Sequence, residues 1–312
     1  MSPGYVLSDI FNMNCIFRYI KFELLIATIL MFGANSSYAQ LNPLGAVYYQ
    51  NQYLANPAMA GTDTSLNVSL SYRMQWSGIK GAPVNQSFTS DWGIGNRVGI
   101  GLMVYNDKAG LLQRTRAMAT YAYHLPLAES QKLHFGISMG IMTQRVQYED
   151  VIGDPNDAGL EQFNNRETFF DGDFGMAYTS GKLNVQAALP NMKVILNKDE
   201  NDNTVNRSAF FSAISYKMPL EGFVGGMAVE PKIAYRGVKG FDNMIDVGAN
   251  LSFSQDKLNL MSIWHSSENM TYGLGINHNR LFSFTGMYSS NIGELKGFAN
   301  GNFEMAIRVR VL

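Results

Sequence analysis

The residues whose types suggest catalysis are a serine between two glycines and a set of histidines. Gly136, Ser138 and Gly140 match the nucleophile-elbow pattern G-x-S-x-G, which needs a strand, a sharp turn and then a helix. Here the flanking residues continue a strand-like alternation, so Ser138 is expected to be a small inward residue. The histidines lie on different predicted strands without the spacing of metal ligands: His124, His134, His265 and His278. The sequence therefore predicts no catalytic site and no metal site.

Two predicted loops, 150–161 and 197–203, are acidic. Neither has the ligand spacing of a calcium loop, so we interpret the charge as solvent-exposed and expect no cofactor. A barrel hydrolase would need a serine, a histidine and a polar orienting group that converge on the outer surface. His265 lies near an outer strand end, but nothing in the sequence pairs it with a serine. The two loops are the best places for a partner to dock, because loops on a rigid scaffold carry recognition.

The element that would carry these residues is a strand with two unlike faces. Between residues 66 and 76 every second side chain is apolar, and the intervening ones are polar: Leu66, Val68, Leu70, Tyr72, Met74 and Trp76 against Asn67, Ser69, Ser71, Arg73 and Gln75. Successive side chains of a strand point to opposite sides, so this stretch is a strand with an apolar face and a polar face.

The same pattern recurs along the chain and predicts fourteen strands. They cover 66–76, 85–93, 97–106, 113–125, 132–147, 168–179, 182–189, 207–218, 226–236, 243–253, 257–265, 270–278, 280–289 and 301–311. Connections after even-numbered strands are short, and those after most odd-numbered strands are longer, as in outer-membrane barrels with periplasmic turns and extracellular loops. We therefore predict an all-β fold, a transmembrane antiparallel up-and-down β-barrel of about 14 strands.

The faces of the predicted strands favour lipid outside and polar groups inside. A spanning sheet must close on itself, because the bilayer core offers no water to its backbone groups. Trp76, Trp92 and Trp264 fall near strand ends and are expected to face outward at headgroup level. The alternative is a soluble all-β protein in which these are core aromatics. The last strand ends Val309-Arg310-Val311-Leu312, without the terminal aromatic residue that such barrels often carry.

Composition limits the partners. The chain has 312 residues, a net charge of -1 and 16% charged residues, whereas soluble domains carry about 25%. A nucleic-acid partner is not expected, because it would require a basic surface. The single cysteine, Cys15, lies in the predicted signal peptide, so the mature chain is expected to have no thiol.

The predicted domains are a signal peptide, a short polar segment and the barrel. Residues 1–39 carry Arg18 and Lys21 before an apolar run, with Ser37-Tyr38-Ala39 as a small-residue cleavage site. Both Met1 and Met13 remain open as the true start. Residues 40–64 are interpreted as an extended periplasmic or lumenal segment, or a plain tether. Residues 65–312 are the predicted barrel.

Several strings of residues resemble the PorP/SprF family of outer-membrane proteins from Bacteroidota, over nearly the whole mature chain. The specific part is Tyr72-Arg73-x-Gln75-Trp76-x-Gly78 followed by Gly81-Ala82-Pro83. The other positions of the motif lie before and after it: Asn56, Pro57, Gly61, Asn106, Asp107 and Gly110. Additional support comes from Tyr121-Ala122-Tyr123 and Leu133-His134-Phe135-Gly136.

The resemblance implies a non-enzymatic role in the cell outer membrane, within the type IX secretion and gliding machinery. Expected partners are outer-membrane lipid, a secreted adhesin or another type IX client protein, and periplasmic type IX components. The alternative is an outer-membrane channel or transporter for a small or hydrophobic solute.

The sequence allows two physical roles for the motif. Arg73 and Gln75 point inward on the first strand and would hydrogen-bond the N-terminal segment or a loop against the lumen wall. Gly78, Gly81 and Pro83 would instead only shape the first extracellular hairpin, since glycine and proline set backbone angles there. Both readings remain open at this point.

Overall fold

A computed structural model describes residues 44–76, 81–146, 168–192, 208–220, 226–238, 243–279, 281–291 and 301–311. The predicted signal peptide, both acidic loops and Gly78 lie outside the described residues. No helix among the described residues is long and apolar enough to cross a bilayer.

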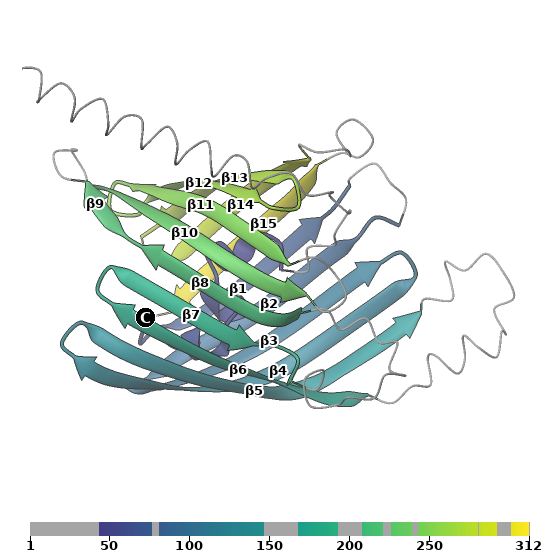
Figure 1. Ribbon diagram of the computed structural model, residues 1–312, viewed down its shortest axis with the longest axis horizontal. Helices are drawn as coiled ribbons and strands as arrows, with labels where there is room; N and C mark the ends of the chain where they lie inside the picture. The colour runs from purple at the N-terminus through teal and green to yellow at the C-terminus, as the bar shows by residue number, and fades with distance from the viewer. Residues whose placement is uncertain are drawn as a thin grey trace, which may run out of the picture. The chain divides into compact units, whose positions relative to one another are not determined.

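The described residues form three short 3-10 helices followed by antiparallel strands (Figure 1). The helices are η1 (Val47–Tyr49), η2 (Gln52–Leu54) and η3 (Pro57–Met59). The first eight strands are β1 (Leu66–Met74), β2 (Val84–Ile94), β3 (Val98–Ala109), β4 (Leu112–Ala128), β5 (Gln131–Val146), β6 (Phe169–Ser180), β7 (Leu183–Leu189) and β8 (Ser208–Tyr216). The remaining strands are β9 (Met218–Leu220), β10 (Met227–Val238), β11 (Met244–Phe253), β12 (Leu258–His265), β13 (Asn269–His278), β14 (Phe282–Asn291) and β15 (Asn302–Val311).

The sheet closes into a barrel because its first and last strands pair. In β1 and β15, Leu66 lies opposite Val311 and Met74 opposite Phe303, and β10 pairs with β11 on the far side of the ring. Both β8 and β9 pair with β10, so fifteen labelled strands make fourteen positions around the ring. The predicted fourteen-stranded antiparallel barrel is confirmed.

A proline explains the break between β8 and β9. The partner strand β10 carries Pro231, which has no N–H to donate to a ladder. The pairing of β10 with β8 stops at Lys232, and its pairing with β9 resumes at Val229. Lys217, between the two short strands, donates its backbone N–H to Lys182 O instead, at 2.9 Å.

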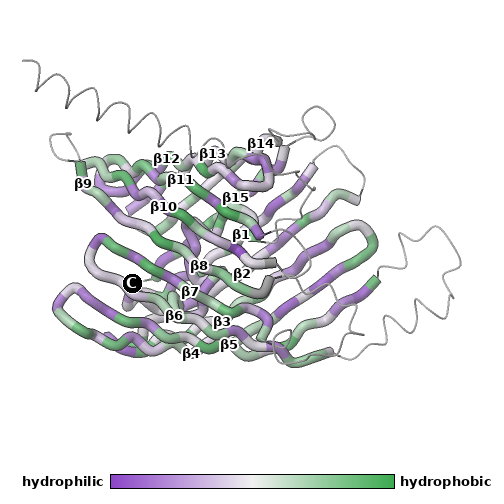
Figure 2. The backbone as a smooth tube through the Cα atoms, viewed as in Figure 1, coloured by the Kyte–Doolittle hydropathy of each residue, from purple (hydrophilic) through white to green (hydrophobic). Residues whose placement is uncertain are grey.

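The faces of the wall are apolar outside and polar inside. On β1, Leu70 and Tyr72 are 55% and 45% exposed, whereas the alternate Ser69 and Arg73 are buried. Figure 2 shows the same alternation of apolar and polar residues along the other strands. Trp92 and Trp264 face outward, as predicted. Because the exposed face is the apolar one, this wall is built for lipid outside.

The first strand was predicted to cover residues 66–76, which is longer than the observed strand. β1 ends at Met74, and Trp76 follows it with a positive φ of 49° and a half-buried side chain. Its backbone N–H donates to Asn302 Oδ1 at 3.3 Å. The chain therefore leaves the sheet before Trp76, which is not a strand residue.

The two ends of the barrel differ, and we name them for their connections. At the short-turn end, residues 95–97, 129–130, 181–182 and 254–257 connect successive strands. At the long-loop end lie 75–83 and the connections after β5, β7 and β14. Two connections at that end are nonetheless tight, 110–111 and 266–268. In outer-membrane barrels the short turns are periplasmic.

Candidate functional site in the barrel lumen

Residues 44–63, which we call the lumenal segment, run through the barrel from the long-loop end to the short-turn end. Leu44 lies beside the connection of β3 to β4, and Gly61 contacts Trp92 and Gly99 at the opposite end. Figure 1 shows this part of the chain in purple among the strands. Apolar residues of the segment and of the wall form one buried cluster. The segment contributes Val47, Tyr48, Tyr49, Tyr53 and Leu54, and the wall contributes Met103, Met118, Phe211, Ile263 and Met287.

At the long-loop end, two carboxylates hold the start of the segment. Glu304 on β15 accepts the backbone N–H groups of Ala46 and Val47, at 2.8 and 3.2 Å. The Tyr48 hydroxyl donates to Asp246 on β11. Both carboxylates are buried, so each hydrogen bond replaces lost hydration.

Asp246 is the centre of a larger buried network. Arg236 reaches it at 2.6 Å and His265 Nδ1 at 2.7 Å, while His265 Nε2 contacts Thr271 Oγ1 at 2.8 Å. His265 thus points into the lumen and orients a carboxylate, in contrast to the outer-surface position considered from the sequence.

Two further cations reach the middle of the segment. Lys232 Nζ donates to Tyr49 O at 3.1 Å, and the Tyr49 hydroxyl donates back to Lys232 O at 2.9 Å. Arg308 donates to Gln50 O at 2.7 Å. The wall from β10 to β15 therefore holds the segment with long charged side chains.

The wall from β2 to β6 holds the segment by close approach at glycines. A Cβ at Gly136 would overlap the backbone of Pro57 and Ala58, and one at Gly175 would overlap Asn56. Gly93, Gly99 and Gly101 meet the segment in the same way, at Asp63, Ala60 and Tyr53. These strands leave no room for any side chain at those positions.

The motif residues of the lumenal segment contact the wall from β2 to β6. Asn56 caps η3 by accepting Ala58 N–H at 3.0 Å, and it donates to Met176 O at 3.0 Å. Pro57 occupies the first position of η3, where its missing N–H costs nothing. Gly61 has a φ of +64° and donates to Asp91 at 3.0 Å.

The other motif residues gather at the long-loop end. Arg73 and Gln75 point inward and are buried, as predicted, and Tyr72 faces outward. Gly110 N–H donates to Gly81 O at 3.1 Å, and both glycines have positive φ, 58° and 78°. Gln75 N–H donates to Pro83 O at 2.9 Å. Ala82 lies between Gly81 and Pro83 in the sequence. Asp107 accepts from Asn85 at 2.5 Å, and Asn106 accepts from Gln113 at 2.9 Å. The motif therefore joins the first two connections at this end.

Two of the histidines that looked scattered in the sequence are neighbours. His124 on β4 and His134 on β5 approach at 2.8 Å between their Nδ1 atoms, and His124 Nε2 contacts Gly61 O at 3.1 Å. The described residues contain no group of three or more potential metal ligands among His, Cys, Asp and Glu.

Ser138 is buried, and its hydroxyl is hydrogen-bonded to Thr120 Oγ1 at 2.7 Å. The same Thr120 oxygen is hydrogen-bonded to the Tyr53 hydroxyl at 2.7 Å. Its side chain supports the segment.

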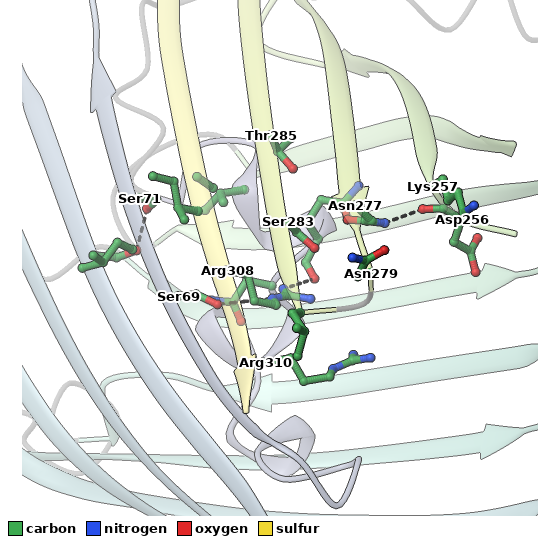
Figure 3. A pocket seen from close by; sticks show the side chains of 18 of the residues that line it. Ser69, Ser71, Asp256, Lys257, Asn277, Asn279, Ser283, Thr285, Arg308 and Arg310 are labelled. Carbon is green, nitrogen blue, oxygen red and sulfur yellow. Dashed lines mark hydrogen bonds between the residues drawn. The ribbon is translucent and has the colours of Figure 1, made fainter. Parts of the chain in front are cut away.

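A polar cavity of about 670 Å³ remains between the segment and the charged wall, at the short-turn end (Figure 3). Its lining is rich in hydroxyl and amide groups: Ser69, Ser71, Ser283, Thr285, Asn277 and Asn279. Arg308 and Arg310 face it from β15. A second cavity of about 530 Å³ shares Gln50, Asn51 and both arginines with the first.

A smaller cavity of about 260 Å³ at the long-loop end is mainly apolar, with Leu44, Leu54, Met142 and Phe211 in its wall. Beside it Arg116 bridges Asp171 at 2.9 Å and Asp173 at 2.6 Å. These bonds tie β4 to β6 inside the barrel.

Comparison with known proteins identifies the family. The sequence profile of the type IX secretion system membrane protein PorP/SprF matches residues 37–309. The chain belongs to the PorP/SprF family. Membership in this family, together with a closed barrel whose apolar face is exposed, places the chain in the outer membrane. The matched range includes the lumenal segment as well as the strands.

Other comparisons are more distant. No curated protein matches the chain. Among solved structures it is similar to Omp33 of Acinetobacter baumannii, with 9% identity over 80% of this chain and 99% of that one and a TM-score of 0.47. It is also similar to the Pseudomonas putida toluene transporter TodX, with 7% identity, 88% and 95% coverage and a TM-score of 0.48. Such distant similarity does not indicate what this chain binds.

Proposed function

We propose that this barrel is a non-enzymatic scaffold of the type IX machinery that supports export or surface anchoring of a client, such as a secreted adhesin. The observation that carries the proposal is the filled lumen. The lumenal segment is held by strands on both sides of the ring, through hydrogen bonds to Glu304 and Asp246 on one side and through close packing at the glycines of β2 to β6 on the other. A barrel filled in this way is better suited to a platform than to an open channel.

Family membership supports a secretion role, and the long-loop end supplies the surface for a client. The motif residues around Gly81 and Gly110 brace the first two connections there. Loops on a rigid barrel are suited to recognition, since the strands position them at little cost in entropy. The short-turn end would meet periplasmic components.

The experiment is deletion of the gene followed by complementation. Loss of the barrel is expected to release one surface adhesin into the medium and to leave nutrient uptake unchanged. The wild-type gene is expected to restore retention. Unchanged retention of every client on the cell surface would overturn the proposal.

The alternative, a solute channel, is tested on the purified protein. Planar bilayers containing the full chain are expected to show no steady conductance. Stable open-channel currents from the intact protein would favour a transporter instead.

A further inference from the structure

Arg308 carries a positive charge on the wall of the polar cavity. Its Nε donates to Ser69 Oγ at 3.2 Å and another nitrogen donates to Gln50 O at 2.7 Å, but it forms no ion pair with any residue that the structure describes. Asp63 is engaged by Arg310 at 3.0 Å, and Asp91 accepts from Gly61 N–H at 3.0 Å. Asp91 and Asp63 act on this buried charge only from beyond salt-bridge distance, and Arg310 opposes it, so Arg308 can still pair directly with an anionic ligand.

The space in front of Arg308 suits a ligand in size and chemistry. The cavity of about 670 Å³ is within the range of known ligand sites, about 300–1,000 Å³. Figure 3 shows Ser283 and Thr285 on one side of Arg308 and Ser69 on the other. Hydroxyl and amide side chains both donate and accept hydrogen bonds, as the peptide groups of a bound chain require.

The mouth of this cavity lies at the short-turn end. Asp256, Lys257 and Asn279, which come from the turns after β11 and β13, contribute to its lining. Since that end of an outer-membrane barrel faces the periplasm, a ligand would arrive from the periplasmic side.

We propose that this cavity binds a carboxylate of an extended peptide segment that enters from the periplasm. Arg308 would pair with the carboxylate through its unused guanidinium N–H groups, in a charge-assisted and geometrically specific contact. The serine, threonine and asparagine side chains would bond the peptide backbone on either side. The inference rests on the outer-membrane location and not on which client is exported.

The test uses the purified full chain in detergent and two synthetic peptides. Acetyl-Gly-Ser-Glu-Ser-Gly-amide is titrated by calorimetry against the same peptide with Gln in place of Glu. The Glu peptide is expected to bind at least about tenfold more tightly, which is the usual value of one charge-assisted hydrogen bond. Equal binding of the two peptides, or no binding of either, overturns the proposal.

Variants locate the site. Arg308→Gln is expected to abolish the preference for Glu, while Arg97→Gln, which removes an exposed charge at the 95–97 turn, is expected to keep it. Ser283 lies opposite Arg308 in the β14–β15 ladder. Ser283→Glu therefore supplies a carboxylate from within, keeps the charges balanced for folding, and is expected to exclude the Glu peptide. Unaltered peptide binding in Ser283→Glu would contradict the assignment even if Arg308→Gln failed to fold.

Inorganic phosphate separates a peptide site from a general anion site. Phosphate at the same concentration is expected to displace the Glu peptide only weakly, because it is too small to reach the hydroxyl and amide side chains on both sides of Arg308 that a peptide backbone would bond. Full displacement by phosphate would overturn the peptide assignment. Since binding is measured on purified protein, its outcome is independent of adhesin retention in cells.

Discussion

The two halves of the barrel wall hold the same segment by different means. From β2 to β6 the wall touches the segment directly at glycines such as Gly136 and Gly175. From β10 to β15 the wall contacts the segment with the side chains of Glu304, Asp246 and Lys232. The glycine half adds close approach to hydrogen bonds such as that of Asn56 to Met176 O, whereas the charged half holds the segment through long charged side chains. The polar cavity lies on the charged half.

The largest expected effect on the free energy of unfolding comes from Asp246, in the charged half from β10 to β15. Asp246→Asn leaves Arg236 buried without its counterion, and we expect a loss of about 3–5 kcal/mol in unfolding free energy. Urea unfolding in phosphatidylcholine vesicles, followed by tryptophan fluorescence, measures it. Asp256→Asn is the control, because its pair with Lys217 is about half exposed, and a loss below about 1 kcal/mol is expected. If Asp246→Asn lost as little unfolding free energy as Asp256→Asn, the buried charges would not be what stabilises this half of the barrel.

The glycine half is tested by adding one methyl group. Gly136→Ala forces a Cβ into the backbone of Pro57 and Ala58, and we expect a loss of about 1–3 kcal/mol by the same unfolding measurement. Gly275→Ala is the matched variant on β13. The nearest atoms to its Cβ, on Asn259 and Thr285, are 3.4 Å away, so it is expected to be tolerated. A tolerated Gly136→Ala would remove the distinction between the halves.

The anchoring of the start of the lumenal segment is tested by hydrogen exchange at its backbone amides. Glu304→Gln keeps the size of the side chain but weakens its bonds to the backbone N–H groups of Ala46 and Val47, by about 1 kcal/mol. Hydrogen exchange at these two amides is expected to accelerate, with little change at Ala58 on the glycine half. Uniform acceleration along the whole segment would mean that the two halves are not separate anchors.

The smallest effect is expected at the short-turn end. The Arg310–Asp63 pair is 3.0 Å long, but its side chains are 34% and 43% exposed. Arg310→Gln is expected to cost at most about 0.5 kcal/mol, and less in high salt. A double-mutant cycle with Asp63→Asn gives the coupling energy, and a value above about 2 kcal/mol would contradict the view that this contact is solvent-screened.

Much of the wall was predictable from period-two patterns. The predicted strand 243–253 corresponds to β11. Charged residues at inward positions, such as Asp246, Glu304 and Arg308, were the available signal for contacts inside the lumen. Alternation within one strand indicates which way such a side chain points, but it does not identify the partner. The position of Trp76 was mispredicted because alternation continues for two residues after the ladder has ended.

The sequence by itself determined the strand number, the lipid-facing side and the places where the chain turns, because alternation and turn residues act over a few neighbouring positions. The tertiary structure alone decided what fills the lumen. Ala46 and Glu304 are 258 positions apart, and Gly136 needs a missing side chain only because Pro57 and Ala58 press against it. No local pattern encodes such distances, since they arise when the sheet closes and brings both halves of the wall around one segment.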